Sequence, residues 1–187
     1  MSTNGFDSLR KHTIIALVED RPGVLNRIVS KWRQRGFNIE SLAVGHSETP
    51  GLSRMTFVVD ANTDAEQVVK QVDKLVDVVD IRDISDEEIM MREMALIKVA
   101  ADSDNRSRII EIADIFKAEI IDVAKNSIIL EVTGEEEKID SMYALLADFG
   151  VIEMVRTGRV ALIRGSEASH QPPEHEGYER YPGGELW

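Results

Sequence analysis

The 187-residue sequence contains no cysteine. Disulfide bonds, cysteine nucleophiles and cysteine-ligated metal sites are therefore excluded, and this absence is typical of a reducing compartment. No apolar run approaches the roughly 18 residues that a membrane-spanning helix needs, and the polar segment 1–11 lacks the pattern of a signal peptide. We expect a soluble, cytoplasmic protein without a membrane segment.

Basic residues are in the minority. The chain has 22 Lys and Arg against 34 Asp and Glu, a formal net charge of -12. The electrostatic field of this negative charge repels nucleic-acid phosphates. The sequence has no cluster of basic residues interleaved with aromatic residues that would counter this repulsion. We therefore expect no nucleic-acid partner.

Motifs for catalysis are also missing. The sequence has no glycine-rich phosphate loop, no Gly-x-Ser-x-Gly nucleophile turn and no zinc-spaced histidine pair within a predicted domain. The histidines lie at predicted strand ends or near the C-terminus, where we interpret them as solvated polar residues: His12, His46, His170 and His175. We expect no catalytic residue and no cofactor site in this chain.

Two acidic runs could suggest a metal site. Asp86–Glu88 is interpreted as part of a solvated linker. Glu135–Glu137 lies in the predicted first turn of a helix, where carboxylates interact favourably with the helix dipole. Each run has a structural explanation, so the sequence predicts no metal site.

Hydrophobic residues make up 43% of the chain, and their spacing predicts regular structure. In the first half, apolar β-branched runs predict strands and 3.6-residue periodicity predicts helices, with a capping box at Thr63–Glu66. The predicted order is a strand at 12–18, a helix at 24–35, strands at 37–45 and 53–60, a helix that includes 68–76, and a strand at 78–84.

The second half repeats this order without convincing residue identity. A second capping box is expected at Thr133–Glu136. The predicted elements are a strand at 94–100, a helix capped by Asp102 or Ser103, strands at 120–124 and 128–132, a helix ending at Gly150, a strand at 151–155 and an additional strand at 159–163.

These patterns predict an α+β protein of two tandem ferredoxin-like β-α-β-β-α-β sandwiches, each with its helices on one face of a mostly antiparallel sheet. The C-terminal residues are rich in Pro, Gly, Glu and His and have no periodicity. The predicted organisation is a leader at 1–11, domains at 12–85 and 94–165, a linker at 86–93 and a disordered tail at 166–187.

The turn before the first helix is a candidate anion site. Asp20 and Gly23 precede that helix, where backbone N–H groups are free and the helix dipole is positive. Asn38 follows its end, roughly 18 Å away for 12 residues. One amino-acid-sized ligand can reach both only if two subunits share it. The alternative is that Gly23 merely turns the chain and Asn38 caps a hairpin or helix end.

The sequence around this helix resembles that of a known protein family. Val18-Glu-Asp-Arg-Pro-Gly-Val-Leu-Asn-Arg27, Gly36-Phe-Asn-Ile-Glu-Ser-Leu42 and Leu52-Ser-Arg-Met-Thr56 are similar to the ACT domain of acetolactate (acetohydroxyacid) synthase regulatory subunits. The resemblance continues through Gln71–Val78, Arg92–Val99 and Ile120–Val123, so it covers roughly residues 12–165.

This resemblance implies a non-catalytic homodimer, formed through ACT domains, that activates a separate catalytic large subunit. Thiamine diphosphate, magnesium and FAD would belong to that partner. Valine would act as feedback inhibitor of branched-chain amino-acid synthesis, although leucine and isoleucine remain open. Carried over by position, the effector site comprises Asp20, Gly23, Val24 and Leu25 of one subunit and Asn38 and Ile39 of the other.

One position departs from the family pattern, because relatives often have asparagine where this chain has Asp20. An aspartate can accept a hydrogen bond from the effector's ammonium group but would repel its carboxylate. Two other functions remain open. The chain could be a stand-alone ACT-type amino-acid sensor that regulates another enzyme or a transcription factor, or, less favoured, a catalytic enzyme.

Overall fold

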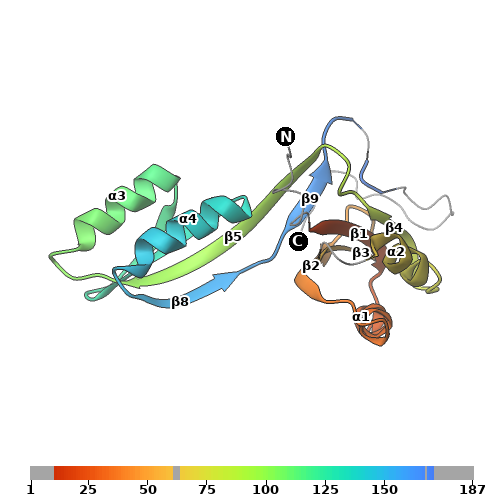
Figure 1. Cartoon of the computed structure of the whole chain (residues 1–187). Helices are drawn as coiled ribbons and strands as arrows, with labels where there is room; N and C mark the ends of the chain where they lie inside the picture. Colours follow the sequence, from red (N-terminus) through yellow and green to blue (C-terminus); the bar gives the residue numbers. More distant parts are fainter. Residues whose placement is uncertain (1–10, 61–63, 167, 171–187) are drawn as a thin grey trace, which may run out of the picture. The chain divides into compact units, whose positions relative to one another are not determined.

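The computed structural model describes residues 11–60, 64–166 and 168–170, and it divides into two compact units. The first unit contains the chain up to Met90 and again from Ala161. Its strands form an antiparallel sheet in the order β2-β3-β1-β4. The elements (Figure 1) are β1 (His12–Glu19), α1 (Val24–Gln34), β2 (Ile39–His46), β3 (Leu52–Val59), α2 (Ala65–Val72) and β4 (Val78–Asp83).

Both helices of the first unit pack on one face of this sheet. Alternate residues of β1, such as Ile14 and Ala16, point to this face, where they meet the apolar stripe of α1. Trp32 of α1 and Phe57 of β3 lie at the centre, with ring centroids 4.2 Å apart. Burial of this stripe explains why α1 forms at this position.

The helix boundaries follow local chemistry. α1 begins after Gly23, whose φ of 88° suits glycine, and Gly36 with φ 74° follows its end. The side chain of Asp64 accepts a hydrogen bond from the N–H of Gln67 and so caps α2. α2 ends at Val72, so the predicted helix through Val76 was too long; Val76 is 93% exposed.

The second unit, Met91–Val160, repeats the same topology with a core of its own. Its main strands follow the order β6-β7-β5-β8, and α3 and α4 lie on one side of this sheet (Figure 1). The predicted fold class, two ferredoxin-like units in tandem, is therefore confirmed. The elements are β5 (Ile89–Ala100), α3 (Arg106–Phe116), β6 (Glu119–Val123), β7 (Ser127–Gly134), α4 (Glu136–Ala147) and β8 (Val151–Arg156).

The predicted linker and the predicted capping box before the last helix do not match the structure. The linker expected at 86–93 is largely strand, because β5 already begins at Ile89, which packs against a buried cluster of the first unit. The capping box expected at Thr133–Glu136 does not form, since Thr133 and Gly134 end β7 and Glu135 precedes α4 without a side-chain cap.

The chain returns to the first unit after β8. Strand β9 (Val160–Ile163), which corresponds to the additional strand expected at 159–163, pairs with β5. Ala161 is buried in a cluster with Ile84 and Ile15. Ile15 is the β1 residue between Ile14 and Ala16, so its side chain points away from the helices. This cluster lies on the sheet face opposite the helices. Residues 161–165 of the predicted second domain thus belong to the first compact unit of the structure.

The start of the expected tail is also packed. Ser169 accepts a hydrogen bond from the N–H of Ile163, and His170 is 7% exposed. Arg54 donates to Nδ1 of His170 at 3.0 Å, so His170 can donate through Nε2 to Glu48 at 2.7 Å. His170 is thus buried, and the expectation that it is a solvated residue was wrong. Residues 167 and 171–187, with His175, lie outside the described residues.

This packing predicts where the chain can be shortened. Ending it after His170 should leave the thermal unfolding midpoint nearly unchanged, whereas ending it after Gly165 should lower it, because Glu48 and Arg54 lose their shared partner.

Burial acts to raise the pKa of Glu48, but a backbone hydrogen bond, His170 and Arg54 together lower it. The stabilisation that the ionised Glu48 gains from His170 and Arg54 should therefore be present at neutral pH and be lost as pH falls through that lowered pKa. Equal midpoints for the two truncated chains would contradict this role of His170.

Candidate functional site

The structure places the residues of the expected effector site at opposite ends of α1. Asp20, Gly23, Val24 and Leu25 lie at its N-terminus, and Asn38 and Ile39 follow its C-terminal end. The 11 residues of α1 separate these groups by roughly 16 Å at 1.5 Å per residue. One subunit therefore does not bring the two groups together around a small ligand.

The N-terminal group presents mainly backbone. Val24 is 2% exposed in the core, and its N–H donates to the carbonyl of Arg21 at 3.3 Å. Gly23 offers no side chain to cap the other N–H groups of the first turn, which have no acceptor within the helix. Leu25 is 39% exposed and adds an apolar surface beside them. This combination suits a small anion with an apolar side chain.

A buried carboxylate fixes a cation one turn into α1. Asp77, which is 7% exposed, accepts hydrogen bonds from Nε and one terminal nitrogen of Arg27 at 2.7 and 2.8 Å. The carbonyl of Asp77 also accepts the N–H of Glu19 at 2.9 Å. These bonds tie β1, α1 and the segment before β4 together just below the turn.

Asp20, which precedes the turn, contacts the hairpin between β2 and β3. Its N–H donates to the carbonyl of Gly51, and its carboxylate is 3.2 Å from Nδ1 of His46 at the end of β2. The side chain of Asp20 is 46% exposed. The first unit thus displays a carboxylate beside an uncapped helix N-terminus, which is a complementary arrangement for a zwitterion.

Sequence reasoning missed Arg27, His46 and Asp77. Arg27 stands four residues after Gly23 and therefore on the same side of the helix. That spacing could have identified it. The pairs that Arg27 makes with Asp77 and that His46 makes with Asp20 join distant segments, and no local pattern marks them.

The corresponding turn of the second unit is filled by its own side chains. Asp102 accepts hydrogen bonds from the N–H groups of Asp104 and Asn105 at 2.9 and 3.0 Å. Arg106 donates to main-chain carbonyls around the β6–β7 hairpin. The N–H groups of Asp104 and Asn105, which precede α3, are therefore already bound, although no side chain caps the helix itself.

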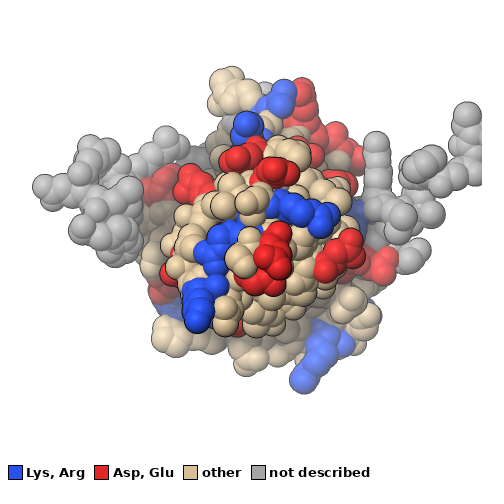
Figure 2. Space-filling view, turned by 90° about the vertical axis from the view of Figure 1, so that its left-hand side faces the viewer, with Lys and Arg blue, Asp and Glu red and all other residues tan. Residues whose placement is uncertain are grey.

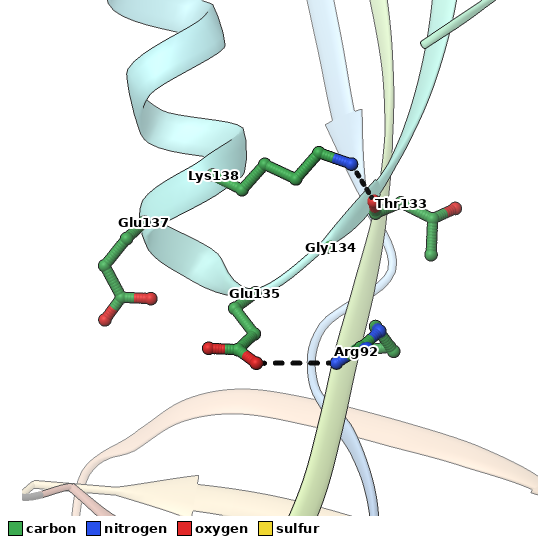
Figure 3. A pocket seen from close by; sticks show the side chains of 6 residues that line it. All are labelled: Arg92, Thr133, Gly134, Glu135, Glu137 and Lys138. Atoms are coloured by element: carbon green, nitrogen blue, oxygen red, sulfur yellow. Dashed lines mark hydrogen bonds and ion pairs between the residues drawn. The ribbon is translucent and has the colours of Figure 1, made fainter. Parts of the chain in front are cut away.

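The structure also shows a hollow of about 310 Å³ within the second unit, at the start of α4 (Figure 3). Arg92 pairs with Glu135 at 3.5 Å, and Lys138 donates to the carbonyl of Thr133 at 2.8 Å. These contacts use both cations of the hollow, and the carboxylate of Glu137 is exposed. Figure 2 shows Lys and Arg interspersed with Asp and Glu on the face in view.

Glu93 beside this hollow predicts a pH-dependent stability. Burial, and then the neighbouring Glu136, raise the pKa of Glu93, which is 8% exposed. Its ionisation therefore disfavours the folded state as pH rises through that pKa. Glu93→Gln should raise the unfolding midpoint at pH 8 and lose this advantage in acid, whereas exposed Glu153→Gln should change little at either pH. A destabilised Glu93→Gln at pH 8 would contradict the argument.

The described residues contain neither a metal-binding group nor a membrane-spanning helix. Within the part of the chain that the structure describes, no three His, Asp, Glu or Cys side chains are grouped closely enough to hold a metal ion. No helix among residues 11–60, 64–166 and 168–170 is sufficiently long and apolar to span a membrane.

Comparison with known families covers both units. A family model described as "AHAS small subunit-like ACT domain" matches residues 14–80, and one described as "Small subunit of acetolactate synthase" matches residues 92–165. The acetolactate synthase small subunit of Mycobacterium bovis is 46% identical over 159 residues, 84% of this chain and 95% of that protein. The chain belongs to the acetolactate synthase small-subunit family.

Further acetolactate synthase small subunits support this membership. That of Bacillus subtilis is 44% identical over 159 residues, which cover 84% of this chain and 92% of the relative. The crystal structure of the small subunit from Thermotoga maritima superposes with a TM-score of 0.78 at 40% identity, and it covers 85% of this chain and 100% of its own. The resemblance seen in the sequence, including the ACT domain, is confirmed.

Proposed function

We propose that this chain is a non-catalytic regulatory subunit of acetolactate synthase. In this proposal it binds a catalytic large subunit, raises its activity and makes it sensitive to feedback inhibition by valine. The observation that carries the proposal is the match of both units, residues 14–80 and 92–165, to the small-subunit family models. Thiamine diphosphate, magnesium and FAD belong to the catalytic partner, and both proteins share the cytoplasm.

The effector site of this proposal is the turn before α1, shared between two subunits of a homodimer. It is supported by the uncapped helix start at Gly23, the carboxylate of Asp20 and the exposed side chain of Leu25. Asn38 and Ile39 of the second subunit would complete it, because they lie too far from Gly23 within one chain. A match that included only the ACT domain would suit a stand-alone sensor equally well, but the second unit is matched too.

The first test is enzymatic. The purified chain, supplied with pyruvate, thiamine diphosphate, magnesium and FAD, should form no acetolactate, because no catalytic motif is found in its sequence. Added to its catalytic subunit, it should increase the turnover several-fold. Bovine serum albumin at the same concentration controls for non-specific protection of the enzyme. Acetolactate formation by the chain alone, or unchanged turnover of the mixture, would refute the proposal.

A further inference from the structure

A cation faces the empty space above Gly23. A Cβ atom placed on Gly23 would lie 3.5 Å from Nη1 of Arg27, so this nitrogen borders the volume that the missing side chain leaves free. The φ angle of Gly23, 88°, disfavours any other residue there. The first turn of α1 thus combines backbone N–H groups, an open space and a guanidinium nitrogen on the same side.

The guanidinium group of Arg27 is held in a fixed direction. Asp77 binds Nε and Nη2, which leaves Nη1 as the nitrogen directed toward Gly23. No described residue accepts a hydrogen bond from Nη1. The Asp77 carboxylate is 10% exposed and the Arg27 side chain 47%, so the pair is anchored on the inside and reaches the surface at the turn.

We propose that Arg27 is a ligand-binding residue of the effector site, and that its Nη1 donates a hydrogen bond to the carboxylate of the bound amino acid. The proposal rests on the proposed function, which places an amino acid at this turn. The carboxylate lies between the N–H groups of the first turn and Nη1 of Arg27, and the ammonium group lies toward Asp20. Arg27 thereby offsets the repulsion that Asp20 exerts on the carboxylate.

The consequence is a preference for a free carboxylate that depends on Arg27. L-Valine and L-valinamide share the ammonium group and the side chain, but the amide lacks the negative charge. A hydrogen bond to a charged group typically contributes enough to change affinity by roughly 10- to 100-fold. Because Arg27 is half exposed, we expect removal of its charge to reduce the valine-to-valinamide preference by about 10-fold.

The experiment is calorimetric titration of the full chain with each of the two ligands. The variants are Arg27→Met, and Arg27→Gln combined with Asp77→Asn, which replaces the ion pair by two amides and leaves no buried charge unpaired. Arg82→Gln, on β4, removes a cation remote from the turn and serves as the control. Both Arg27 variants should show a preference for valine about 10-fold smaller than that of the wild type, and the control should keep the wild-type preference.

The outcomes separate this inference from the proposed function. If the wild-type chain prefers valine and both Arg27 variants bind valine and valinamide more weakly by the same factor, Arg27 has only a structural role and the inference is wrong. An unchanged preference in the variants also overturns it, while the effector site stands. A wild-type chain that binds neither ligand overturns the proposed effector site, and the inference with it.

Discussion

Gly23→Asp is expected to abolish inhibition by valine while activation of the catalytic subunit persists. A side chain at position 23 would enter the space where the effector's carboxylate is expected, 3.5 Å from Nη1 of Arg27. An aspartate there would place its own carboxylate against that nitrogen and repel the carboxylate of valine. Activation depends on contacts with the catalytic subunit, which this turn need not share.

The measurement is a valine titration of the enzyme reconstituted with the variant. Gly165→Asp is a matched control, because Gly165 also has a positive φ, 93°, with nothing within 4 Å of its Cβ position. It should carry a similar backbone strain and keep the inhibition. A folded Gly23→Asp subunit that activates the enzyme and has the wild-type inhibition curve would show that the effector binds elsewhere.

A mixture of two insensitive variants should regain valine binding. Asn38→Ala removes a side-chain donor and acceptor at the other end of α1 and should weaken binding on the order of 5- to 150-fold. In a dimer of one Gly23→Asp chain and one Asn38→Ala chain, one site has both changes and the other has neither. Random exchange of subunits should therefore restore about a quarter of the wild-type sites, with wild-type affinity.

Calorimetry of the mixed chains, after mild dissociation and reassociation, measures this number of sites. Each variant treated alone in the same way is the control and should show no such sites. If the mixture contains only weakened sites although mass spectrometry confirms mixed dimers, then Gly23 and Asn38 do not act on one ligand from different subunits.

Much of the fold could be predicted because local patterns determine it. The apolar stripe from Val24 to Trp32 and the glycines at its ends are sufficient to predict α1 and its limits to within a residue. The apolar, β-branched runs likewise predict most strands of both sheets. The separation of Gly23 from Asn38 followed from helix length alone, so the two-subunit argument was available before the structure.

Contacts between distant segments account for what the sequence did not predict. His170 is buried because Glu48 and Arg54 lie in the hairpin beside it, more than 100 residues earlier in the chain. The orientation of the Arg27 guanidinium group depends on its hydrogen bonds to Asp77. The approach of Nη1 to Gly23 follows from that orientation and could not be predicted from the sequence. The charged run at 86–88 suggested a linker, but the apolar residues that follow it extend β5.

The most direct test of the account is the valine response of the catalytic subunit with and without this chain. Initial rates of acetolactate formation are measured over a range of valine concentrations, first for the catalytic subunit alone and then for the reconstituted enzyme. We predict that the catalytic subunit alone is insensitive to valine and that the reconstituted enzyme is more active and is inhibited by valine. The same valine curve in both cases would contradict the account.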